Sequence, residues 1–127
     1  QLRGVPLLQA LSAEALLQVA ESVARIEAEP GTVLVAEGDE PRHYWIVLEG
    51  ALSATRRGRV AATYNAGDFV GELGMGAPRA PVTIRTDSAA SLLQMTHDGF
   101  EDLIDSVPGL TRNLTRHLAA RLRRGLS

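Results

Sequence analysis

The sequence has 127 residues, of which 45% are hydrophobic and 22% are charged. This composition fits one globular domain with one core and argues against disorder. The formal net charge of -2 is unlike that of a nucleic-acid-binding domain, and the lack of cysteine excludes disulfides, thiolate metal sites and a cysteine nucleophile. No stretch approaches the length of a membrane span and no signal peptide is visible, so we expect a cytoplasmic domain without membrane contact.

The first predicted element is a helix within residues 5–26, which read VPLLQALSAEALLQVAESVARI. Ser12 occupies the position of an N-cap, and Glu14 falls in the first turn, where an acidic side chain is favourable. The apolar positions that share one face of this helix are Leu16, Val19 and Val23. Together these signals predict an amphipathic N-terminal helix.

Short strands are predicted after Pro30, where the pattern changes to runs rich in β-branched and aromatic residues. Five runs each close on a glycine: TVLVAEG, HYWIVLEG, ALSATRRG, RVAATYNAG and DFVG. Two more, VTIRT and SLLQM, follow later in the chain. Turn signals at such near-regular intervals predict a sandwich or a barrel-like roll of about eight strands.

Helical character returns after His97. Asp98 can cap a short helix that ends near Pro108 and carries Phe100, Leu103 and Ile104 on one side. A last helix has one narrow apolar stripe at intervals of four residues, made of Leu110, Leu114, Leu118 and Leu122. Its other faces carry five arginines: Arg112, Arg116, Arg121, Arg123 and Arg124.

The predicted fold class is therefore mainly β: an eight-stranded β-roll of the jelly-roll type with an N-terminal helix and two C-terminal helices. The whole chain, 1–127, forms one domain in this prediction. It divides into a helical part (1–28), the roll (29–96) and the C-terminal helices (97–127).

The stretch most suited to binding a ligand is GELGMGAPRAPVT, residues 71–83. Gly71 permits a tight turn, and the first amides of a helical turn after it would suit an anion. Arg79 offers a planar, charged donor fork for phosphate. A carboxylate would repel a phosphate, so Glu72 must bind another part of the ligand. A sugar hydroxyl is the obvious partner, because a carboxylate accepts a strong hydrogen bond from it. The stretch therefore predicts a site for a nucleotide with one compact phosphate.

These residues also carry a family resemblance. The chain resembles the cyclic nucleotide-binding domains of catabolite-activator-type regulators, protein kinase A regulatory subunits and gated channels. LSAEALLQVA resembles the leading helix, and PGTVLVAEGDEPRHYWIVLEG resembles the glycine-punctuated opening strands. NAGDFVGELGM and PRAPVTIRT resemble the start and the end of the family's phosphate-binding cassette, and FEDLIDSVPGL resembles the helix that follows. The match runs over nearly the whole chain.

The resemblance implies the ligand and its contacts. The implied ligand-binding residues are Gly71, Glu72, Leu73, Arg79, Ala80, Pro81 and Val82. Backbone amides of the first three would bind the cyclic phosphate, and the Glu72 carboxylate would bind the ribose 2′-hydroxyl. Arg79 would pair with the equatorial phosphate oxygen, and Ala80 would offer its N–H. Since a hydroxyl near Ala80 tends to help guanine in this family, cAMP is implied before cGMP.

The resemblance also implies a mechanism and partners. The helix bearing Leu110, Leu114 and Leu118 would close over the base and pass the change to a covalently attached output domain. The domain would then be a sensor rather than an enzyme, with no cofactor, no metal and no catalytic residue.

Several alternatives stay open at this point. On spacing alone, Glu72 and Arg79 could be a surface ion pair. The interval between them is about two residues shorter than in the usual cassette, and Pro81 removes a backbone donor. Both departures suit a roll that has lost its ligand and serves for docking or dimerisation. The leucine stripe would then be an interdomain seam or the contact of a homodimer.

Two further classes receive less support from the residues. A cupin-like metal enzyme would need a paired histidine beside His43 and Glu49, and the sequence has none there. The arginine-rich last helix could bind phosphates of nucleic acid, but such charges are more often the solvated face of a helix.

Overall fold

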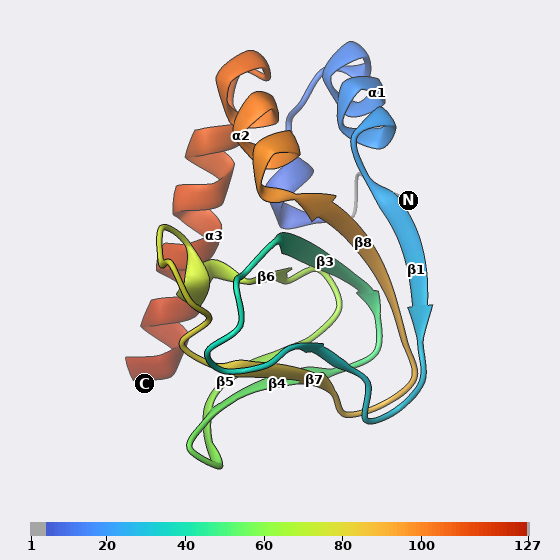
Figure 1. The fold of residues 1–127 in the computed structure, drawn as a ribbon. Helices are drawn as coiled ribbons and strands as arrows, with labels where there is room; N and C mark the ends of the chain where they lie inside the picture. The colour runs from blue at the N-terminus through green and yellow to red at the C-terminus, as the bar shows by residue number, and fades with distance from the viewer. Residues whose placement is uncertain (1–4, 127) are drawn as a thin grey trace.

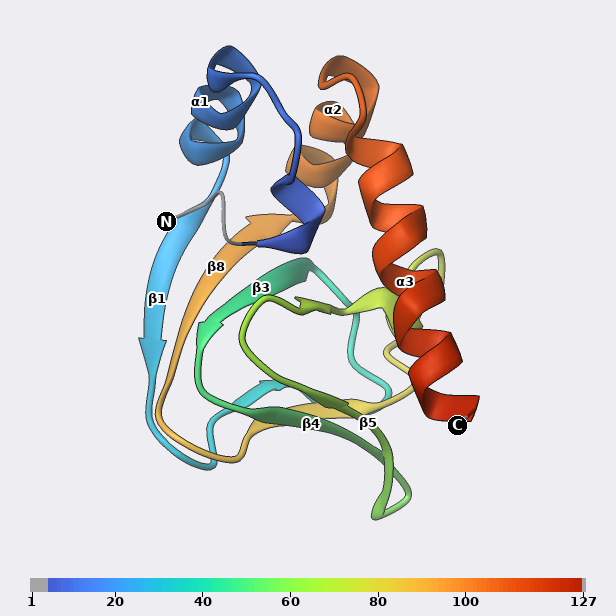
Figure 2. The same cartoon turned by 180° about the vertical axis from the view of Figure 1, so that it is seen from behind.

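The computed structural model describes residues 5–126, and for residues 124–126 it describes the backbone alone. Within this part of the chain it contains eight strands in two antiparallel sheets and three α-helices (Figures 1 and 2). The helices are α1 (Ala13–Glu21), α2 (His97–Ser106) and α3 (Leu110–Leu126), with short 3-10 turns η2 (Pro6–Leu8) and η3 (Glu72–Gly74). The predicted fold class, a β-roll flanked by helices, is confirmed.

The strands follow one another closely along the chain. Their bounds are β1 (Ala24–Ala28), β2 (Val33–Val35), β3 (His43–Glu49), β4 (Leu52–Arg56), β5 (Arg59–Tyr64), β6 (Phe69–Val70), β7 (Thr83–Thr86) and β8 (Ala90–Thr96). One sheet has the order β1-β8-β3-β6 and the other β2-β7-β4-β5. The sheets face each other across the roll, and the helices gather at one end and along one side (Figure 1).

The first strand was not among the predicted ones, because residues 24–26 were assigned to the N-terminal helix. In the structure α1 ends at Glu21, and Ala24–Ala28 pairs antiparallel with β8 along its whole length. β1 lies at the edge of its sheet and is largely exposed, and its sequence, ARIEA, alternates between apolar and charged residues over only five positions. Pairing with a strand about 65 residues later in the sequence decides its conformation, and local periodicity does not report that pairing.

The helix starts depend on side-chain caps. Ser12 accepts a hydrogen bond from the Ala15 N–H at 3.0 Å, as predicted. The second helix is capped two residues earlier than predicted: the side chain of Thr96, not of Asp98, accepts a hydrogen bond from the Gly99 N–H at 2.9 Å. Asp98 lies in the first turn instead, where its negative charge interacts favourably with the positive end of the helix dipole.

Two apolar clusters fill the protein. One lies inside the roll and includes Trp45, Tyr64 and Ile84. The other packs the helices onto the first sheet and includes Tyr44 and Phe69. Tyr44, Trp45 and Phe69 are each no more than 5% exposed, so all three are core residues.

The leucine stripe of α3 faces this second cluster. Leu110 is 1% exposed and Leu114 is 9% exposed, and Leu118 packs against the cluster at its margin. Only Leu122, at 67% exposure, points away from the protein. The first half of the stripe is therefore part of the domain's own core, and it is unavailable as a seam between subunits or domains.

Candidate functional site

The candidate site centres on the cassette, residues 71–82, which connects β6 to β7. Gly71 opens it with φ of +111°, and the predicted helical turn follows as η3. Within the described residues, the backbone amides of Glu72 and Leu73 have no hydrogen-bond acceptor. The first amides of a helical turn normally lack a partner, which is why they suit an anion.

Gly71 is required by the packing as well as by its backbone angle. A Cβ atom there would lie 2.9 Å from Cδ1 of Tyr44, whereas at Gly76, with φ of +78°, it would meet nothing within 4 Å. We expect Gly71→Ala to lower the free energy of unfolding by about 1–3 kcal/mol more than Gly76→Ala does, because both changes strain the backbone but only the first adds an overlap. Urea unfolding of the two variants measures this difference. Equal losses would contradict it.

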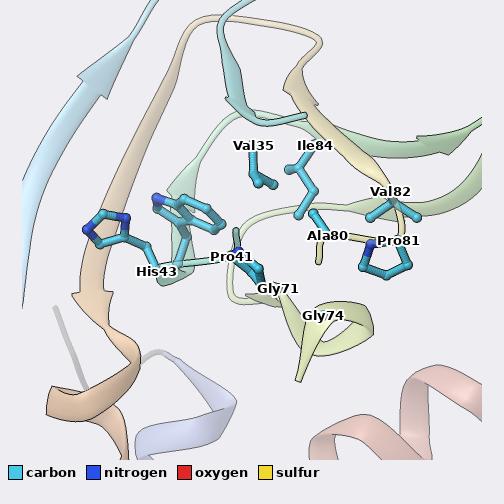
Figure 3. A pocket seen from close by; sticks show the side chains of 10 residues that line it. Val35, Pro41, His43, Gly71, Gly74, Ala80, Pro81, Val82 and Ile84 are labelled. Carbon is cyan, nitrogen blue, oxygen red and sulfur yellow. The ribbon is translucent and has the colours of Figure 1, made fainter. Parts of the chain in front are cut away.

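One face of the cassette lines a narrow apolar cavity inside the roll (Figure 3). Ala80, Pro81 and Val82 lie opposite Gly71 and Gly74, and the remaining wall comes from β2, β3 and β7 and from Pro41, which precedes β3. The cavity measures about 20 Å³, which is room for about one water molecule. Four of the seven predicted ligand-binding residues thus surround a space that is too small for a nucleotide in this structure.

The opposite face of the cassette lines a larger groove of about 740 Å³, open to solvent. Its wall is formed by β5 and the chain after it, by η3 and by α3: Ala61, Ala62, Thr63, Asn65, Asp68, Glu72, Leu73, Leu118, Arg121 and Leu122. This volume lies in the range of small-molecule sites. Two of the predicted residues, Glu72 and Leu73, belong to this groove rather than to the cavity.

Glu72 is held by two side chains from other elements. Its Oε2 accepts a hydrogen bond from Nη1 of Arg121 at 2.6 Å, and its Oε1 accepts from the Tyr64 hydroxyl at 2.9 Å. The side chains of Arg121 and Glu72 are only 13% and 14% exposed. The predicted alternative of a surface ion pair with Arg79 is therefore wrong: Glu72 is paired, but with α3.

The local electrostatics agree with this arrangement. Burial raises the pKa of Tyr64 well above its ordinary value, and the charge of Glu72 raises it further, so the phenol remains a donor. Burial works to lower the pKa of Arg121, but the nearby Glu72 carboxylate outweighs it and leaves the pKa raised. The guanidinium also lies over the Tyr64 ring, 4.5 Å from its centroid.

Arg79 and Ala80 both bond to the chain that precedes β3, although Arg79 is exposed and Ala80 is buried. The exposed Arg79 donates from Nη1 to the Gly38 carbonyl at 3.0 Å. The Ala80 N–H, predicted to face the phosphate, donates instead to the Asp39 carbonyl at 2.7 Å, and the Gly38 N–H donates to the Ala80 carbonyl at 2.9 Å. In this structure the Ala80 amide is thus bonded to the chain that precedes β3. The Ala80–Pro81 peptide bond is trans.

The residues that the sequence did not reveal are Tyr64 and Arg121. In the sequence, Tyr64 is one of several aromatic residues in predicted strands. Arg121 is one of five arginines on helix faces that were expected to be solvated. The one signal that distinguishes Arg121 is its spacing from His117, four residues earlier on the same face. His117 is 7% exposed, and its Nε2 accepts from the Phe69 N–H at 3.1 Å.

Metal-ligand clusters and membrane-spanning helices are both absent from the part of the chain that the structure describes. It holds no group of three or more histidine, aspartate or glutamate side chains that could bind a metal ion. No helix there combines the length and the apolarity needed to cross a lipid bilayer.

Comparison with known proteins identifies the fold and the family. The cyclic nucleotide-binding domain family matches residues 25–107, which span β1 to the end of α2 and include the whole cassette. The regulatory subunit of the cAMP-dependent protein kinase of Hypocrea atroviridis is 30% identical over 122 residues, 94% of this chain. The chain spans only 26% of the length of that relative.

Solved structures agree on the fold. The catabolite activator protein of Thermus thermophilus superposes with a TM-score of 0.78 at 23% identity, over 94% of this chain and 59% of that chain. The regulatory subunit of a cAMP-independent protein kinase A from Trypanosoma brucei gives a TM-score of 0.77 at 22% identity, over 90% of this chain and 44% of that chain. The second similarity shows that the fold occurs in a kinase subunit described as cAMP-independent, so the ligand needs its own evidence.

Proposed function

Since this chain belongs to the cyclic nucleotide-binding domain family, a family of ligand-sensing rather than catalytic domains, we propose that it binds a cyclic mononucleotide, cAMP in preference to cGMP. Binding would alter the contacts of α3 with the cassette, and α3 would transmit that change to an attached domain. The mechanism is a population shift, which requires only that one arrangement of α3 binds the ligand better than the other.

The observation that carries this proposal is the cassette itself. A glycine-opened turn whose first amides have no acceptor in the described part of the chain supports an anion-binding role, and the Glu72 carboxylate lies at the wall of a nucleotide-sized groove. Arg79 is exposed and, among the described residues, forms one hydrogen bond, to a carbonyl, so its guanidinium can turn toward a phosphate at little cost. We propose that Gly71, Glu72, Leu73 and Arg79 make the principal contacts, with Ala80, Pro81 and Val82 forming the wall behind them.

Calorimetric titration of the domain with cAMP, cGMP and 5′-AMP tests the proposal. We expect saturable binding of cAMP in the micromolar range, weaker binding of cGMP, and little binding of 5′-AMP, whose phosphate is not joined to the 3′ oxygen. No heat with either cyclic nucleotide, in a sample that shows a cooperative unfolding transition, would overturn it.

A further inference from the structure

Four strands lie at the edges of the two sheets, and three of them have features that commonly protect an edge from further pairing. β6 has only two residues, and the pairings of β2 and of β5 with their neighbours each contain a register shift. β1 differs from these three strands. Its five residues pair with β8 without any shift, so its other edge presents a regular row of backbone groups.

The free edge of β1 is accessible. β1 is the outermost element on its side of the roll in both views (Figures 1 and 2). Among the described residues, its backbone pairs with no strand other than β8. Such an edge is a template for one more strand, and a second copy of the same chain can supply that strand.

The two charged side chains of β1 lie together on the outer face of the strand. Arg25 is 51% exposed and Glu27 is 67% exposed, and Arg25 Nε donates to Glu27 Oε2 at 3.1 Å. Ile26, between them, packs against the apolar cluster inside the roll. Ser91 Oγ, from β8, donates to the other oxygen of Glu27 at 2.6 Å. These bonds hold both charges beside the free edge, and a carboxylate with one donor on each oxygen can accept further donors.

The order of these charges favours one way for two copies of β1 to pair. In an antiparallel pair centred on Ile26, Arg25 of each copy lies opposite Glu27 of the other, so two pairs of opposite charge form. A register slip by two residues places Arg25 opposite Arg25 or Glu27 opposite Glu27, and a slip by one residue brings no opposite charges together. A parallel pair in register opposes like charges at both positions. Charges on an edge strand usually prevent pairing, but here they disfavour these alternatives and favour the symmetric pair.

We propose that β1 is the interface of a homodimer, in which the β1 strands of two copies pair antiparallel about Ile26 and join two four-stranded sheets into one continuous sheet. The contact is isologous, because the same strand serves on both sides of the two-fold axis. The strand that leads into the cassette, β6, lies at the opposite edge of the same sheet, and the dimer does not depend on the proposed function. Five residues on each side are few for a stable interface, so we expect a weak dimer with a dissociation constant of roughly 10–1000 µM.

Sedimentation equilibrium of the domain at concentrations from about 10 µM to 1 mM tests the proposal. We expect wild type to pass from monomer toward dimer over this range. Arg25→Glu and Glu27→Arg should each dimerise about tenfold more weakly or worse, because each change places like charges opposite one another twice. An equimolar mixture of these two variants should regain the association of wild type, because the mixed dimer sets two glutamates opposite two arginines. The double variant, in which the two charges are exchanged, should also dimerise as wild type does.

Arg85→Glu is the matched control for Arg25→Glu. It makes the same change of net charge at an exposed position of β7 and should leave dimerisation unchanged. Urea unfolding shows whether each variant is folded. Should a charge reversal prevent folding, Arg25→Gln and Glu27→Gln remove the same opposite-charge pairs by a milder change and should also weaken the dimer.

Three results would overturn the proposal. The first is a folded wild type that stays monomeric over the whole range of concentration. The second is a dimer that the folded variants of Arg25 and Glu27 form as readily as wild type, because its contact would then lie elsewhere on the protein. The third is a mixture of Arg25→Glu and Glu27→Arg that associates no better than either variant alone.

Discussion

Arg79→Ala is expected to weaken cAMP binding by about 30-fold or more. A guanidinium that pairs with a desolvated phosphate contributes through charge and through two parallel hydrogen bonds, and its removal costs about 2–5 kcal/mol of binding free energy. In this structure Arg79 is exposed and bonds only to the Gly38 carbonyl within the described residues, so the same change should leave stability almost unaltered. Calorimetry for binding and urea unfolding for stability measure the two effects separately.

Two variants serve as controls for Arg79. Arg79→Lys keeps the charge without the planar fork and should retain part of the affinity. Arg85→Ala removes an exposed arginine from β7, a few residues away, and should bind cAMP as wild type does. If Arg79→Ala and Arg85→Ala bind cAMP equally well, then Arg79 does not contact the phosphate and the cassette works in another way.

Leu110→Ala is expected to lower the free energy of unfolding by about 2–5 kcal/mol, the usual range for a leucine removed from a core. Leu110 is 1% exposed and belongs to the cluster that joins the helices to the first sheet. Leu122→Ala, at the exposed end of the same stripe, should change stability by no more than about 0.5 kcal/mol. Urea unfolding of both variants, at two protein concentrations, is the measurement.

The comparison of Leu110 with Leu122 also tests the dimerisation alternative. If Leu122→Ala lowers stability by more than about 1 kcal/mol, and the loss grows with protein concentration, then Leu122 packs against a second copy of the chain. A loss below about 1 kcal/mol for Leu110→Ala would contradict the packing of α3 described above.

The sequence predicted most of the fold because its signals are local. Glycines such as Gly38, Gly50 and Gly58 adopt positive φ at strand ends, so they mark the turns correctly. Ser12 capped the helix that it was expected to cap, because capping involves residues only three apart. The structure differs where a distant strand decides, as at β1, or where two neighbouring polar residues compete for one cap, as at Thr96 and Asp98.

The sequence predicted which segment forms the candidate site, but not how the side chains of that segment are arranged in space. Gly71 and Glu72 are adjacent in sequence, yet one lines the cavity and the other the groove. Which way each side chain turns depends on partners far along the chain: Arg121 lies 49 residues after Glu72, and Gly38 lies 41 residues before Arg79. Residue type does not identify such pairs: the five arginines on α3 are equal candidates by type, and only the four-residue spacing from His117 distinguishes Arg121.

The order of strands in the first sheet has a consequence for how the chain acquires its structure during synthesis. β8 is an inner strand of that sheet and pairs with both β1 and β3, so neither has this partner until Thr96 has been made. Ala90 follows Ala24 by 66 residues, and at usual rates of translation this separation corresponds to roughly 3–13 s. During that time β1 is an unpaired strand, and unpaired strands invite aggregation. Arg25 and Glu27 place two charges within its five residues. Charges of this kind reduce the aggregation of a strand whose partner has not yet been synthesised.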